Sequence, residues 1–73
     1  MTETEMQWQE RHRRALNELA NAEWALLAME KLERLEPTAY GIKAIARQRM
    51  FVNYLIAELS AMEAEAGRLE EGV

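Results

Sequence analysis

The chain has 73 residues, a formal net charge of −4 at pH 7, one histidine and no cysteine. This length allows a single domain with a small core, and the composition excludes both disulfides and a structural zinc site built from cysteine and histidine. A chain this short needs another source of stability, so we expect it to form an oligomer or to bind a partner.

The N-terminal sequence, residues 1–5, is acidic, and no apolar segment typical of a signal peptide follows it. The longest apolar run, Trp24 to Met29, is far shorter than the roughly 20 residues that a membrane-spanning helix needs. Since the chain also lacks cysteine, we expect a cytoplasmic protein without a membrane segment.

The first predicted helix runs from about residue 4 to residue 35. Thr2 or Thr4 can cap its N-terminus, because Glu5 or Gln7 follows three residues later, as a capping box requires. Apolar residues recur at steps of three and four, which predicts one buried stripe along the helix. The large residues of this stripe are Trp8, Leu19, Leu26 and Met29, with Leu16, Leu27 and Leu32 beside it.

The sequence Glu36-Pro37-Thr38 predicts a turn in the middle of the chain. Proline disfavours a helical conformation at Glu36, and Thr38 can cap a second helix over about residues 39–69. The second helix carries its own stripe with heptad spacing, interrupted by Gln48, whose amide either reaches water or lies buried and sets the register. The apolar members of that stripe are Ile45, Val52, Leu55, Leu59 and Met62.

Two amphipathic helices joined by a tight turn predict an all-α fold, an antiparallel two-helix hairpin with coiled-coil-like packing that forms one domain over residues 1–73. We call the two buried stripes together the seam. Folding at the turn also brings opposite charges together, so we expect ion pairs between the helices. The expected pairs set Arg11, Arg13 and Arg14 against Glu58, Glu63 and Glu65, and Glu23, Glu30 and Glu33 against Lys43, Arg47 and Arg49.

The single histidine, His12, lies on the predicted seam near the open end of the hairpin, where it can hydrogen-bond to Glu63 or to a terminal group. No Glu-x-x-His pair, glycine-rich phosphate loop or nucleophile motif occurs in the sequence. We therefore expect neither catalysis nor a bound metal or cofactor.

Each helix also carries apolar residues on a side that a single hairpin leaves uncovered. At about 100° per residue, Trp24 lies about 150° from the seam of its helix. Large residues next to alanines suit the close approach of another helix, although scattered exposed apolar residues are also normal. These second-stripe residues, which we expect to form an interface, are Ala20, Trp24, Ala28, Met50, Tyr54, Ala57 and Ala61.

The second stripe favours a homodimer in which two hairpins form a four-helix bundle, together with a second protein partner. Whether Trp24 and Tyr54 contact the other copy or the partner stays open. In its overall plan the chain resembles small acidic helical hairpins among the accessory proteins of bacteria and their phages, including inhibitors of host proteins. That resemblance implies a module that regulates another protein by occluding its surface, with Trp24, Tyr54 and Met50 as apolar anchors.

Two other functions are compatible with the same features. The hairpin can be a structural or assembly subunit that only oligomerises. A nucleic-acid regulator is less favoured, because the net charge is negative and consecutive arginines of one helix point in different directions. Its basic residues would be Arg11, Arg13, Arg14, Lys43, Arg47 and Arg49.

Overall fold

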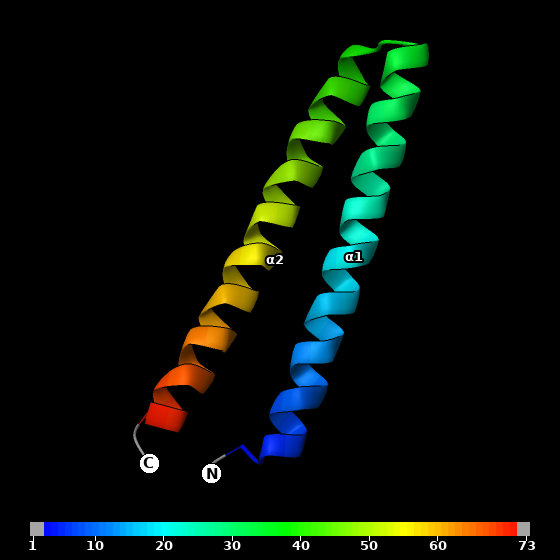
Figure 1. Cartoon of the computed structure of the whole chain (residues 1–73). Coiled ribbons are helices and arrows are strands. Elements are labelled where there is room, and N and C mark those ends of the chain that lie inside the picture. The colour runs from blue at the N-terminus through cyan, green and yellow to red at the C-terminus, as the bar shows by residue number, and fades with distance from the viewer. Residues whose placement is uncertain (1–2, 72–73) are drawn as a thin grey trace.

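The computed structural model describes residues 3–71, which form two helices, α1 (Glu5–Leu35) and α2 (Ala39–Glu71). The helices pack side by side and antiparallel, with the turn at one end and the start of α1 and the end of α2 at the other (Figure 1). The hairpin is 55 Å long and 18 Å wide. The predicted all-α hairpin is confirmed, and α2 continues to Glu71 rather than ending at residue 69.

A capping box begins α1. The Thr4 hydroxyl accepts a hydrogen bond from the backbone N–H of Gln7 at 3.2 Å, and the Gln7 side chain accepts one from the N–H of Thr4 at 3.0 Å. Each bond satisfies a backbone donor that the first turn of a helix leaves free. The alternative cap, Thr2, lies outside the described residues.

The turn is built from caps on both sides of Pro37. At the end of α1, the N–H of Glu36 donates to the carbonyl of Leu32 at 3.0 Å. At the start of α2, the Thr38 hydroxyl accepts from the N–H of Gly41 at 2.9 Å, as an N-cap residue does. The carboxylate of Glu33, on α1, accepts from the N–H of Thr38 at 2.6 Å, so the turn is tied to both helices.

Gly41 is needed for space rather than for backbone conformation, because its φ is not positive. A Cβ atom at this position would overlap the carboxylate of Glu33 and crowd the hydroxyl of Thr38. The absent side chain therefore lets Glu33 reach the N-terminus of α2, where a negative charge also interacts favourably with the helix dipole.

The core is narrow and comes mainly from α2. Its centre is a cluster of Ala22, Val52 and Leu55, against which Leu19 and Leu26 pack. The buried hydrophobic residues are Ala22, Ile45, Val52, Leu55, Leu59 and Met62. Since α1 contributes only its alanine to this set, much of the apolar surface of α1 stays outside the core. Within the described residues, neither helix is long and apolar enough to cross a membrane.

Candidate interaction surfaces

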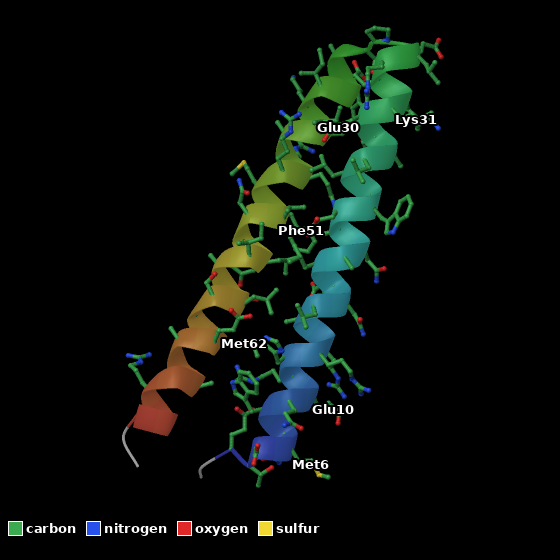
Figure 2. All side chains as sticks on the ribbon, viewed as in Figure 1. Met6, Glu10, Glu30, Lys31, Phe51 and Met62 are labelled. Carbon is green, nitrogen blue, oxygen red and sulfur yellow. The ribbon has the colours of Figure 1, made fainter. Side chains whose placement is uncertain are left out.

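The nine large residues predicted for the seam lie on the sides of the helices that face each other. Those of α2 are buried, and those of α1 are half-buried. In Figure 2, Met62 points toward α1, whereas Met6, Glu10 and Lys31 point away from α2. The facing sides are therefore used for the internal contact and leave the outer sides for any partner.

Gln48 crosses the seam. Its Nε2 donates to the backbone carbonyl of Ala22 at 2.9 Å in a half-buried position. The side chain therefore points at the opposite helix rather than at bulk water. Because the carbonyl of Ala22 has a fixed position along the axis of α1, this bond favours a single register of the two helices.

The arginines at the open end pair differently from the expectation. Arg11 binds the carboxylate of Glu3 at 2.8 Å, and Arg13 and Arg14 both approach Glu10 at 3.5 and 3.4 Å. Among the described residues, these arginines therefore make their direct ion pairs near the N-terminus and not with α2. Side chains three or four residues apart on one helix are already neighbours, so pairing within α1 requires no ordering of the opposite helix. The hydrogen bond to Glu3 raises the pKa of Arg11, and the charge of Glu65 on α2 still contributes to raising it.

At the closed end, the expected charge pattern is present in part. Arg49 lies 3.9 Å from Glu30 across the two helices. Glu33 does not pair with a basic residue of α2 but caps its N-terminus through Thr38. Exposed pairs such as Arg49–Glu30 contribute only about 0–1 kcal/mol, so they orient the helices more than they stabilise them.

At the open end, a histidine that stacks on a tryptophan of the same helix contacts a carboxylate of α2. The rings of Trp8 and His12 are nearly parallel, with centroids 4.8 Å apart, and His12 Nε2 lies 3.2 Å from Glu63 Oε1 of α2. The expected contact between His12 and Glu63 is therefore present. Among the described residues, the buried indole nitrogen of Trp8 has no hydrogen-bond partner. His12 thus acts as a bridge between a half-buried tryptophan and a solvent-exposed carboxylate.

The second-stripe residues do not form one surface. Trp24 follows the buried Ala22 by two residues, and Met50 precedes the buried Val52 by two, so each points about 160–200° away from the opposite helix. Their exposed fractions are 73% for Trp24 and 72% for Met50. They therefore lie on opposite outer sides of the hairpin, and one two-fold contact between two hairpins cannot cover both.

Tyr54 lies on the same outer half of α2 as Met50 and is 58% exposed. Its hydroxyl donates to the carboxylate of Glu58 at 2.9 Å, and this hydrogen bond raises the pKa of the phenol. The alanines of the second stripe, Ala20, Ala28, Ala57 and Ala61, are exposed as well. Tyr54 is therefore held along the helix by Glu58 while more than half of the residue stays exposed.

On α1, an open depression runs along the side next to Trp24. Its walls include Leu16 and Leu27, which are 45% and 57% exposed, with Ala20 between them. The sequence predicts Ala20 and Trp24 in an interface, and Leu16 and Leu27 beside the seam. The steps of four, three and four residues from Leu16 through Ala20 and Glu23 to Leu27 are the signal that groups the leucines with Ala20. The lining residues are Leu16, Leu19, Ala20, Glu23, Trp24 and Leu27.

No group of three or more His, Cys, Asp or Glu side chains in the described part of the chain is placed to hold a metal ion. Comparison with known proteins finds no matching family model, curated protein or solved structure. Functional proposals therefore depend on the surfaces of the hairpin itself.

Proposed function

We propose that the protein is a non-catalytic protein–protein interaction module that binds another protein and regulates it by covering part of its surface. The observation that supports this proposal is the distribution of apolar side chains: among the residues whose side chains the structure describes, twelve large ones are exposed, whereas six hydrophobic residues are buried. An apolar surface of this extent on a small chain is typical of a binding surface. Exposed tryptophan and tyrosine are also common anchors of protein interfaces.

The outer side of α2 is the proposed target-binding surface. It presents Met50, Tyr54, Ala57 and Ala61 along one side of a continuous helix, with the tyrosine ring fixed by Glu58. The small alanines allow a partner backbone to approach closely, while Met50 can adapt its side chain to an irregular surface. A rigid helix that presents such residues can occlude a groove on its target.

The plan of the hairpin resembles bacterial and phage accessory proteins, which favours a bacterial host protein as the proposed target and the cytoplasm as the proposed compartment. The test is affinity capture from bacterial lysate with the intact protein as bait. We expect a protein that binds the wild type and loses binding to a Met50→Gln, Tyr54→Gln double variant. Leu35→Gln is the matched control, because Leu35 is 76% exposed but lies beside the turn.

The captured protein would then be purified, and its affinity for the wild type and both variants measured by calorimetry together with its activity. Inhibition by the wild type and not by the double variant supports occlusion. Equal binding by all three proteins, or no specific binding at all, contradicts the proposed surface.

A second candidate is a structural subunit that assembles with copies of itself. The opposite placement of Trp24 and Met50 favours it, because two different apolar sides can contact two neighbours and generate an open assembly. Light scattering across a range of concentrations separates the candidates. An assembly subunit grows continuously with concentration, whereas an interaction module stops at a defined small oligomer.

A further inference from the structure

We infer that α1 carries a second coiled-coil seam through which two copies of the chain pair antiparallel. This inference rests on the proposed function in that it assigns one outer side to self-association and leaves the outer side of α2 to the target. The second seam, called the α1 row, follows alternating steps of four and three residues. Its members are Gln9, Arg13, Leu16, Ala20, Glu23, Leu27, Glu30 and Arg34.

The α1 row lies to one side of the internal seam. Leu16 and Leu27 are each about 120–140° around the helix from the buried Ala22, and both are about half-exposed. Leu32 lies on the other flank of the helix, about 80° from Ala22 in the opposite direction. The hairpin thus leaves a row of helical contact positions available on one flank of α1.

The shape of the depression fits a helix. A coiled-coil knob enters a hole formed by residues at positions i, i+3, i+4 and i+7 of the facing helix. The lining residues of α1 form two such holes that overlap at Ala20 and Glu23: the first extends from Leu16 to Glu23 and the second from Ala20 to Leu27. Because the side chain of Ala20 is small, the depression has room at this position for a side chain from another helix.

The charges along the row favour a second copy as the occupant. In the antiparallel register that sets Leu16 opposite Leu27 of the other copy, Arg13 faces Glu30 and Gln9 faces Arg34. Two-fold symmetry repeats each of these contacts at the other end of the interface. The row is thus complementary in charge to itself at Arg13 and Glu30, which favours pairing with a second copy.

Charge also selects the direction of pairing. A parallel pair would set Arg13 against Arg13 and Arg34 against Arg34, which places like charges opposite each other. The antiparallel pair replaces the Arg13–Arg13 repulsion with Arg13–Glu30 contacts, which these side chains make in place of their contacts with Glu10 and Arg49 within the hairpin. Trp24, next to the row, then lies at the level of Leu19 and Ala20 of the second copy and covers the depression.

One residue of the row opposes association. Glu23 lies close to the two-fold axis of this arrangement, so two carboxylates approach each other there. Glu23→Gln removes that repulsion and keeps the size of the side chain. The variant therefore tightens self-association if the row is the interface, and leaves it unchanged if the interface lies elsewhere.

Sedimentation equilibrium of the intact protein tests the surface. We expect a dimer whose dissociation constant rises by about tenfold or more for Leu27→Glu, because a charge enters an apolar contact. Leu32→Glu is the matched control, since it makes the same change on the same helix at a residue that is 67% exposed on the other flank. Circular dichroism verifies that both variants stay helical, and Arg13→Glu gives a second weakened dimer that changes no apolar residue.

Equal effects of Leu27→Glu and Leu32→Glu, or a wild type that stays monomeric at all concentrations, would overturn the inference. A dimer broken by the Met50 and Tyr54 changes instead would also overturn it. Target capture is measured separately, so a monomer that still binds its target removes the dimer and leaves the proposed function standing.

The direction of pairing is tested with spin labels, because the cysteine-free chain accepts single labels cleanly. Asn21→Cys places the labels at the level of the two-fold axis but on the outer flanks of the paired helices, so their separation is set by the width of the helix pair. Met6→Cys places them at opposite ends of the dimer, about 45 Å apart along the helix axis at a rise of 1.5 Å per residue. A separation at Met6 no larger than that at Asn21 indicates a parallel dimer and would contradict the inferred register.

Discussion

The two ends of the hairpin are held in different ways. At the closed end, the polar contacts are made to backbone groups of the turn: Glu33 accepts from the N–H of Thr38, and Thr38 accepts from the N–H of Gly41. At the open end, the link between helices consists of side chains, with His12 stacked on Trp8 and bonded to Glu63. The covalent turn fixes backbone donors in position, whereas the open end depends on flexible side chains.

The two helical glycines show the same difference. Added to Gly41, a Cβ atom would overlap the carboxylate of Glu33, whereas at Gly67 it would meet nothing within 4 Å. Gly41 thus leaves the space that the Glu33 carboxylate needs to reach the N–H of Thr38 at the closed end. At the open end, Gly67 leaves unused space, so identical substitutions at the two positions have opposite expected effects.

The largest expected effect comes from Leu55→Ala, which removes a buried side chain from the central core cluster between the two ends. Leu55 is 3% exposed and belongs to the central cluster. Truncation of a buried leucine costs about 2–5 kcal/mol, which is a large fraction of the stability of a small domain. Circular dichroism should show one cooperative loss of helix at a lower melting temperature. Retention of the wild-type melting temperature would contradict this packing.

Gly41→Ala should destabilise the closed end by about 1 kcal/mol. Alanine favours the helix by roughly 0.5–1 kcal/mol, but the added methyl group displaces Glu33 from a charge-assisted hydrogen bond that contributes about 1.5–3 kcal/mol. Urea denaturation measures the net change. The double variant Gly41→Ala, Glu33→Ala, compared with Glu33→Ala alone, is the control: without the carboxylate the alanine meets only the Thr38 hydroxyl, so its cost should be smaller than in the wild type.

Gly67→Ala should stabilise the chain by about 0.5–1 kcal/mol, since the helix gains propensity and the methyl group meets no neighbour. The same urea titration provides the measurement. A loss of stability comparable to that of Gly41→Ala would show that the open end is packed as tightly as the turn, which removes the contrast between the two ends.

The smallest effect is expected for Glu63→Gln at the open end. The carboxylate is 61% exposed, so its contact with His12 is screened by water, and the change in stability should stay below about 0.5 kcal/mol. Thermal melts at neutral pH provide the measurement. A loss above about 1 kcal/mol would mean that the stacked histidine holds the open end more firmly than its exposure indicates.

The hairpin was predictable because local and long-range signals agree. Pro37 marks the turn, Thr4 and Thr38 cap the helices as expected, and the heptad spacing of residues such as Val52 and Leu55 predicts the buried sides. These features depend on backbone rules and on periodicity, which a sequence displays directly.

The charge contacts and the outer surfaces were less predictable. For Arg13 and Arg14 the sequence offers acidic residues on either helix, and exposed ion pairs all contribute only about 0–1 kcal/mol, so spacing alone does not select between them. Placing Trp24 and Met50 on opposite outer sides requires the directions of both helices relative to each other. A helical projection of either helix alone lacks that information, so the two apolar stripes were grouped as one interface.

The central claim is that apolar residues on the outside of the hairpin form an interface. Trp8→Phe leaves Trp24, 73% exposed in the single hairpin, as the only tryptophan. Its fluorescence emission is then recorded across protein concentration. A shift to shorter wavelength as the protein associates is predicted, because the second copy removes water from the indole. Emission that remains that of a fully hydrated tryptophan while sedimentation shows a dimer would contradict the claim for this side of α1.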